Sequence, residues 1–246
     1  MQNLINKIIR IALPEKKVWE VKNRHNIPSM EWSLQNIHRL GFDAGFAIDA
    51  GAYDGEWTTM FKKIFPASKV LMLEAQVEKE QVLSRVIQKL PGTYFHIGLL
   101  GAEAGKDVVF NVNSTVSSVL EEYKSNDFQK QNRKTETLDD IVLAQRDKLG
   151  SPDFIKLDVQ GYELEVLKGA SNLLGNVQFI LCEVSLLEIN KGCPLIAEVI
   201  RFMDDRSFIP YDICSFIRRP LDKALWQTDV LFIRKNHPLI QNKHWN

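Results

Sequence analysis

The sequence has no excess of charge, few cysteines and no long uninterrupted apolar run. Its 31 lysine and arginine residues are balanced by 31 aspartate and glutamate residues. It therefore lacks the basic excess that is typical of nucleic-acid-binding proteins. We expect a small-molecule or glycan partner and no nucleic acid; the oligomeric state is not readable from the sequence.

Cysteine is sparse, with Cys182, Cys193 and Cys214 the only three in 246 residues. Their spacing matches no metal site, and an odd, sparse set is typical of reduced thiols rather than of a disulfide framework. This composition favours a cytoplasmic location.

The most apolar stretch near the N-terminus, LINKIIRIALP, is interrupted by Lys7 and Arg10. It is too short to span a bilayer and has no small-residue cleavage site. Its leucine and isoleucine residues would share one face of a helix, so we expect a packing helix, with weak peripheral membrane contact as the alternative. We predict a helical N-terminal extension over residues 1–40 and one α/β domain over residues 41–246.

Short apolar runs alternate with helical patterns from Phe46 onward, as expected for a parallel sheet with helices on both faces. The runs FIPYDICSFIR and DVLFIRK, close together near the end, should pair as an antiparallel hairpin. By fold analogy, this order favours a Rossmann-like, seven-stranded, mostly parallel sheet with a C-terminal antiparallel hairpin. Strands are predicted at 46–49, 69–74, 93–100, 154–159 and 177–185, and helices at 28–40, 57–65, 82–90, 135–149, 162–174 and 195–205.

The turn after the first strand reads DAGAYDG, with Asp49 ahead of Gly51 and Gly55. Glycines there let the backbone approach a ligand, but the spacing is not the dinucleotide fingerprint G-x-G-x-x-G. Asp49 would repel a pyrophosphate and attract a ligand with an ammonium and a sulfonium group, such as S-adenosylmethionine. Glu74 ends the next strand, where an acid can accept both ribose hydroxyls.

Two further acids end later strands and are candidates for catalysis. Asp158 follows the fourth strand, and we predict it to be the base or the carboxylate that orients the acceptor. Glu183, at the end of the fifth strand, is the second candidate. Such acids could hold a divalent metal, but no third ligand lies beside Asp158, so we predict no metal. Glu163 is interpreted as a first-turn acid favoured by the helix dipole.

Several blocks of the chain resemble the FkbM-type methyltransferases in content and order: DAGAYDGEWT, LMLEAQ, ETLDD, FIKLDVQGYELEVLKGA, LCEVS and WQTDVLFI. These are class I S-adenosylmethionine-dependent enzymes associated with O-methylation of sugars and natural products. The resemblance spans Phe42 to Ile233, and it departs from the family at Tyr53, where Asn is common, and at Ala75, where Pro is common. It implies a cofactor-binding set of Asp49, Gly51, Ala52, Tyr53, Gly55, Thr58, Glu74, Ala75 and Gln76.

Four polar residues are weaker candidates for contacts with the acceptor. Ser117 and Ser118 lie in the serine-rich segment NSTVSSVL, which also reads as an ordinary surface loop. The resemblance adds Gln227 and Asp229, which otherwise read as a turn leading into the last strand.

The resulting hypothesis is an S-adenosylmethionine-dependent O-methyltransferase that acts on a sugar, glycan or hydroxylated natural product. One alternative is a nicotinamide-dependent oxidoreductase, against which the missing G-x-G-x-x-G counts. Another is a non-catalytic cofactor-binding module, against which the intact acids Asp49, Glu74 and Asp158 count. Transfer to nitrogen or carbon stays open.

Overall fold

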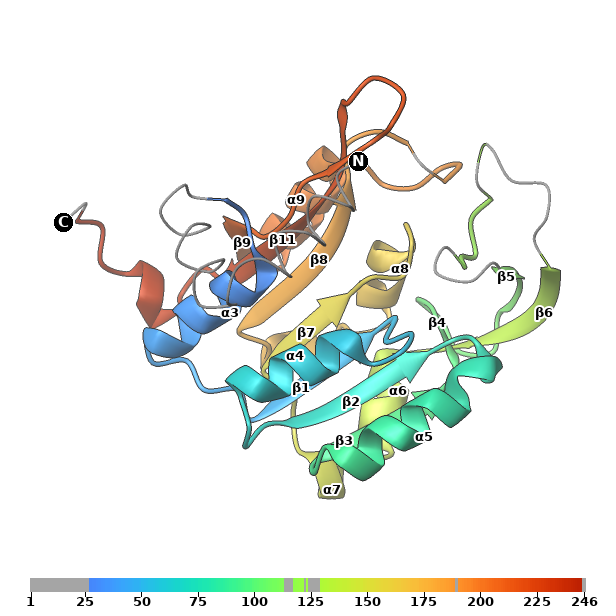
Figure 1. The fold of residues 1–246 in the computed structure, drawn as a ribbon, viewed down its shortest axis with the longest axis horizontal. Coiled ribbons are helices and arrows are strands. Elements are labelled where there is room, and N and C mark those ends of the chain that lie inside the picture. The colour runs from blue at the N-terminus through green and yellow to red at the C-terminus, as the bar shows by residue number, and fades with distance from the viewer. Residues whose placement is uncertain (1–26, 113–116, 122, 124–128, 189, 245–246) are drawn as a thin grey trace, which may run out of the picture.

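The computed structural model describes residues 27–112, 117–121, 123, 129–188 and 190–244 (Figure 1). The apolar stretch LINKIIRIALP, with its predicted packing helix and membrane contact, lies outside these residues. The first described helix, α3 (Met30–Arg39), follows Ser29, whose side chain accepts a hydrogen bond from the Trp32 N–H. This start is the one predicted from the sequence.

The main sheet has the strand order β10-β11-β8-β7-β1-β2-β3, with β9 paired to β11. Its parallel part consists of β1 (Phe46–Ala50), β2 (Lys69–Glu74), β3 (Thr93–Ile97), β7 (Phe154–Leu157) and β8 (Phe179–Ser185). The antiparallel part consists of β9 (Phe208–Ile213), β10 (Ile217–Arg218) and β11 (Leu225–Arg234). Both the mostly parallel sheet and the C-terminal antiparallel pairing were predicted from the sequence and are confirmed.

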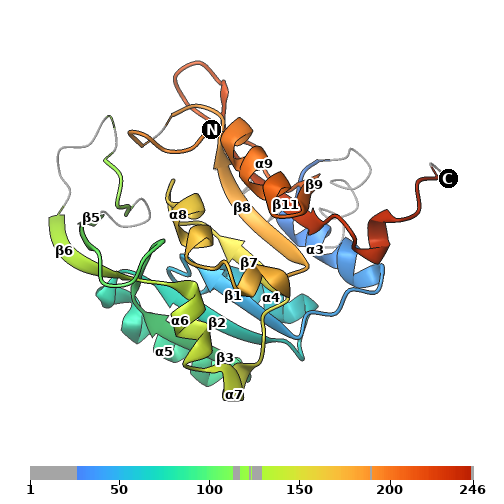
Figure 2. The same ribbon diagram turned by 180° about the vertical axis from the view of Figure 1, so that it is seen from behind.

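Helices cover both faces of this sheet (Figures 1 and 2). One face carries α3, α4 (Glu56–Ile64) and α5 (Glu80–Lys89), and the other carries α6 (Leu138–Leu143), α8 (Glu163–Lys168) and α9 (Ile196–Asp205). The short elements η1 (Val77–Lys79), α7 (Arg146–Leu149) and η3 (Leu173–Gly175) lie in the connections, and η4 (Pro238–Ile240) follows β11.

Two apolar cores follow from the alternation of side chains along each strand. On the α3–α4–α5 side, Phe61 of α4 packs against Phe154 of β7 with ring centroids 5.3 Å apart. On the other side, Ile48 of β1 belongs to a cluster with Leu138 of α6 and Val166 of α8. The strands are thus buried on both faces. Polar residues such as Glu74 and Asp158 lie where the strands end.

A second, three-stranded sheet of order β4-β6-β5 was not predicted. It contains β4 (Leu99–Leu100), β5 (Asp107–Val112) and β6 (Gln129–Glu136). The predicted strand 93–100 is divided at Gly98, where a Cβ atom would collide with the side chains of Glu136 and His96. The chain therefore leaves the main sheet after β3 and pairs with β6 instead.

The predicted helix at 135–149 is wrong at its start and in its middle. Thr135 and Glu136 end β6, and α6 starts only after Thr137, whose side chain accepts a hydrogen bond from the Asp140 N–H. A break separates α6 from α7. Likewise, the predicted helix at 162–174 ends at Lys168, followed by Gly169, where a Cβ atom would collide with the Gly101 carbonyl oxygen.

The described part of the predicted N-terminal extension packs into the main domain. Leu34 and Ile37 of α3 are fully buried in the core on the α4 side. The Ser33 hydroxyl donates to the Asp212 carboxylate of β9 at 2.6 Å. Among the described residues, no helix combines the length and apolar character needed to cross a bilayer.

Leu34→Ala should lower the free energy of unfolding by about 2–5 kcal/mol, because it leaves a cavity at a fully buried site. Urea denaturation of the purified protein measures this loss. Leu40→Ala is the matched control, since Leu40 follows the same helix and is 42% exposed; its effect should stay within about 0.5 kcal/mol. Equal effects of the two substitutions would contradict the packing of α3 against the sheet.

Candidate functional site

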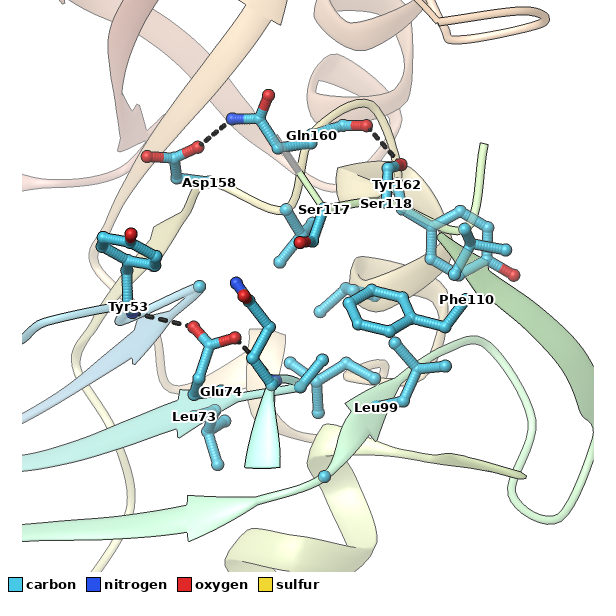
Figure 3. Close-up of a pocket in the computed structure, with 18 residues that line it drawn as sticks. Tyr53, Leu73, Glu74, Leu99, Phe110, Ser117, Ser118, Asp158, Gln160 and Tyr162 are labelled. Atoms are coloured by element: carbon cyan, nitrogen blue, oxygen red, sulfur yellow. Dashed lines mark hydrogen bonds between the residues drawn. The ribbon is translucent and has the colours of Figure 1, made fainter. Parts of the chain in front are cut away.

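A cavity of about 190 Å³ lies at the carboxyl ends of β1, β2 and β7 (Figure 3). This is the edge at which open parallel sheets bind ligands. Apolar side chains from the second sheet and α8 help to close it, including Leu99, Phe110 and Tyr162. The predicted site residues that line it are Gly51, Tyr53, Glu74, Ala75, Gln76, Ser117, Ser118 and Asp158.

Glu74 is fixed at the cavity wall by two backbone donors. One carboxylate oxygen accepts from the Tyr53 N–H at 2.8 Å and the other from the Gln76 N–H at 2.8 Å. Burial raises the pKa of Glu74, and these backbone donors oppose that rise. A carboxylate has about four acceptor sites, so Glu74 retains capacity for two ligand hydroxyls.

The cavity has a polar and an apolar side (Figure 3). Glu74, Asp158 and Gln160 supply polar groups, whereas Leu99 and Phe110 form an apolar wall. A ribose-bearing ligand with a flat heterocycle fits this division, since the acid can accept the hydroxyls and the wall can cover the ring. Phe110 was missed by sequence reasoning, because it comes from β5 of the unpredicted sheet.

The two glycines of the turn after β1 pack against different neighbours. Gly51 has φ +76°, and a Cβ atom there would collide with the carbonyl oxygen of Asp158. Gly55 has φ +74°, and a Cβ atom added there would lie 3.0 Å from a methyl group of Val86 in α5. Only Gly51 lines the cavity. These glycines therefore allow close packing of the turn against Asp158, which follows β7, and against α5, and Gly51 also borders the cavity.

Asp49, Ala52 and Thr58 were predicted cofactor contacts, but they do not line the cavity. Asp49 is fully buried, accepts a hydrogen bond from the Thr58 hydroxyl at 2.7 Å and lies 3.1 Å from the Lys156 ammonium. Its charge is therefore balanced inside the protein. That Asp49 faces a cationic ligand stays a prediction.

Lys156 is a buried cation that sequence reasoning missed. Its ammonium lies 3.1 Å from Asp49 and 3.7 Å from Asp158, and it donates to the Gly51 carbonyl at 2.9 Å. Burial alone would lower the pKa of Lys156, but the two carboxylates outweigh burial and raise it. A lysine inside the apolar run FIKLD was the available signal, because such a charge is rarely buried without a partner.

The predicted acids of the fourth and fifth strands are joined by amide side chains. Gln160 donates to Asp158 at 2.8 Å and to Glu183 at 3.3 Å, and Gln227 donates to Glu183 at 2.8 Å. Burial raises the pKa of Glu183 well above its ordinary value, and the charge of Asp158 adds to that rise. Glu183 and Gln227 lie outside the cavity lining but share this network with Asp158.

Of the remaining acceptor candidates, some line the cavity and one does not. Asp229 is opposite Glu183 in the β11–β8 register, outside the cavity lining, and burial raises its pKa. Ser117 and Ser118 line the cavity, and the Ser118 hydroxyl donates to the Gln160 carbonyl at 2.8 Å.

Glu163 does more than the predicted favourable contact with a helix dipole. It is buried, and one carboxyl oxygen accepts from the Val159 N–H at 3.0 Å and from the Gly161 N–H at 3.1 Å. It therefore holds the loop that carries Asp158. Burial raises the pKa of Glu163 to about 7.

Within the described ranges, no group of three or more histidine, cysteine or acidic side chains is arranged to hold a metal ion. The three cysteines are free and buried.

A family model described as the Methyltransferase FkbM domain matches residues 49–210. The chain belongs to the FkbM methyltransferase family. This confirms the resemblance seen in the sequence. The fold and the cofactor of this family are those of the class I S-adenosylmethionine-dependent methyltransferases, in agreement with the predicted cofactor. The nicotinamide-dependent alternative has no support from this match.

Individual relatives of this FkbM-family chain are distant. A hexuronic acid methyltransferase, AglP of Haloferax volcanii, is 29% identical over 80 residues, which cover 30% of this chain and 34% of that protein. The match thus spans about a third of the relative's length. The N-terminal domain of EvdMO1, whose crystal structure contains S-adenosylhomocysteine, has a TM-score of 0.50 at 11% identity and covers 85% of this chain and 82% of that one. A precorrin-6y C5,15-methyltransferase from Geobacter metallireducens has a TM-score of 0.46 at 10% identity, covering 83% and 85%.

The stability of the protein should depend on the protonation of Glu163. Its pKa rises from 4.5 in the unfolded chain to about 7 in the native state, so the native state holds a proton that the unfolded chain has released. The free energy of unfolding should therefore fall as pH rises from 4.5 to 7 and then level off. Glu163→Gln keeps the acceptor oxygen without the titration and should avoid a loss on the order of 3 kcal/mol.

Urea denaturation between pH 4.5 and pH 8 measures this difference. Glu165→Gln, a substitution in the same helix at a residue that contacts Lys168 at the surface, is the matched control and should follow the parent. Parallel curves for the parent and Glu163→Gln would show that Glu163 does not titrate in this range.

Proposed function

We propose that the protein transfers the methyl group of S-adenosylmethionine to a hydroxyl group of a sugar, a glycan or a hydroxylated natural product. The observation that carries this proposal is the presence of Glu74 and Asp158 on one cavity, at the ends of β2 and β7. Glu74 is suited to bind a ribose, and Asp158 is suited to accept a proton. Cofactor binding and proton transfer therefore each have a residue in the same cavity.

Glu74 would hold the ribose hydroxyls of the cofactor, and the backbone of Gly51, Tyr53, Ala75 and Gln76 would border it. The apolar wall that contains Leu99 would cover the adenine. When bound, S-adenosylmethionine supplies a methyl group on a sulfonium that already carries its leaving group. The protein's contribution is therefore proximity and alignment of the acceptor.

Asp49, Thr58, Ala52 and Gly55 support this site indirectly in the proposal. The Asp49–Thr58 hydrogen bond and the Asp49–Lys156 ion pair fix the turn after β1. These residues would position Gly51 and Tyr53 rather than contact the cofactor.

Asp158 would accept the proton that an acceptor hydroxyl loses during attack. Its side chain is 39% exposed, and its carboxylate lies 3.7 Å from the Lys156 ammonium. Glu183, held beside it through Gln160, would contact the acceptor or shape the space around it. The need for a base favours oxygen as the acceptor atom.

A neutral polyol is the acceptor that best fits the local charge. Asp158, Glu183, Asp229 and the buried Glu163 lie near one another, and Lys156 is a cation beside them. An anionic acceptor would meet the Asp158 carboxylate, which carries charge of the same sign. The name of the Haloferax relative indicates a hexuronic acid, which supports a sugar acceptor; the charges here favour its neutral hydroxyls over its carboxylate as the contact with these acids.

Glu74→Ala should weaken binding of S-adenosylhomocysteine by at least about tenfold, because each hydrogen bond to a charged group contributes about 1.5–3 kcal/mol. Isothermal titration calorimetry measures the affinity. Glu78→Ala, an exposed acid four residues further along, is the control and should bind like the parent. Parent-like affinity in Glu74→Ala would exclude Glu74 from ribose binding.

Asp158→Asn should keep the affinity for S-adenosylhomocysteine and lower turnover about 10²–10⁴-fold, the range for loss of a general base. The assay uses radiolabelled S-adenosylmethionine with a panel of methyl glycosides, nucleotide sugars and hydroxylated lipids. Asp205→Asn, at the exposed end of α9, is the control and should retain full turnover. Undiminished methyl transfer by Asp158→Asn would remove Asp158 from proton transfer.

A further inference from the structure

Gln160 lines the cavity in a backbone conformation that glutamine seldom adopts. Its φ is +55°, and Gly161 follows with φ +91°. A non-glycine residue in the left-handed region is strained, and such residues persist where the surrounding structure holds them in place, often at functional sites. Gln160 therefore needs an explanation beyond its membership of the loop after β7.

Buried donors hold this conformation from two directions. The Gln160 carbonyl accepts from the Ser118 hydroxyl at 2.8 Å and from the Asn190 amide at 2.7 Å. Ser118 is 2% exposed and Asn190 is 3% exposed, so both donors are shielded from water. Glu163 holds the N–H groups on either side of Gln160, those of Val159 and Gly161. The backbone of the loop is thus fixed by three separate segments of the chain.

The fixed backbone places the side-chain amide of Gln160 against the Asp158 carboxylate (Figure 3) and also within reach of Glu183. Its nitrogen is 2.8 Å from Asp158 and 3.3 Å from Glu183. An amide donates at every pH at which the protein is folded, because it does not ionise there. One side chain therefore fixes the relative positions of the two acids that end β7 and β8.

We propose that Gln160 is a positioning residue that orients the Asp158 carboxylate toward the methyl acceptor and holds Glu183 in register with it. This inference rests on the proposed function of the cavity. With one Asp158 oxygen bonded to Gln160 and the other 3.7 Å from Lys156, the carboxylate has a single orientation before any acceptor arrives. A general base must be within hydrogen-bond reach of the proton that it accepts, and this arrangement fixes its direction.

Gln160→Asn separates a positioning role from a purely structural one. Asparagine adopts the left-handed conformation more readily than glutamine, so the backbone is not penalised. Its side chain is one carbon shorter and cannot reach both Asp158 and Glu183 from the same backbone. Gln160→Glu is the second variant: it keeps the length, removes the donor and adds a charge. Gln178→Asn, at a half-buried glutamine whose side-chain amide donates to the Asn176 carbonyl, is the matched control.

The primary measurement is the carboxyl ¹³C chemical shift of Asp158 in the protein without ligand at one fixed pH, assigned by comparison with Asp158→Asn. The resonance should move in Gln160→Asn and in Gln160→Glu, because neither variant keeps the hydrogen bond from the Gln160 amide, and it should stay in place in Gln178→Asn. The affinity for S-adenosylhomocysteine should match the parent. With any acceptor found by the panel assay, kcat should fall at least tenfold, while the KM for S-adenosylmethionine stays at the parent value.

An unmoved Asp158 carboxyl resonance in both Gln160 variants would overturn the proposal. So would a loss of thermal stability and of cofactor affinity without a movement of that resonance, since that pattern describes a structural role alone. The NMR measurement needs no acceptor and no bound cofactor. Failure of the parent protein to bind S-adenosylhomocysteine would therefore sink the proposed function while leaving the Gln160 result readable in its own right.

Discussion

The site depends on the buried ammonium group of Lys156. It joins the carboxylate of Asp49 in β1 to that of Asp158 at the end of β7. It also donates to the Gly51 carbonyl in the turn after β1. Without this cation, Asp49 would be an uncompensated charge in a fully buried position, which costs far more than the pair contributes to stability. The role of the ion pair is to position other groups, because the Lys156 ammonium fixes the turn after β1 relative to Asp158.

Strand register brings these charges together. Asp49 is paired with Lys156 in the parallel β1–β7 ladder, and Glu183 with Asp229 in the antiparallel β8–β11 ladder. Side chains alternate between faces along a strand, so Lys156 and Asp158, two residues apart, lie on the same side. A shift of either ladder by one residue would turn these side chains to the opposite face. The electrostatics of the site are therefore a consequence of how the sheet is paired.

One pattern in the sequence, an acid at the end of an apolar run, predicted both the strand ends and the candidate site residues. Glu74 and Asp158 end apolar runs, and parallel strands bring such ends to one edge, so both were predicted to face a ligand. The second sheet was not predicted, because β6 reads QKQNRKTE and shows no apolar alternation. A residue whose role depends on a distant partner was also missed. Lys156 becomes visible as the partner of Asp49 only through strand pairing.

Two loops that face the cavity each contain a strained non-glycine residue. In the described part of the chain, four non-glycine residues have positive φ, and Tyr53 and Gln160 are the two of these that line the cavity. Tyr53 donates its N–H to Glu74, and Gln160 donates its amide to Asp158. Each strained residue thus orients the carboxylate that its half of the proposed reaction requires. Because the folded core and buried donors bear this strain before any ligand binds, both acids are preorganised, and binding energy need not be used to arrange them.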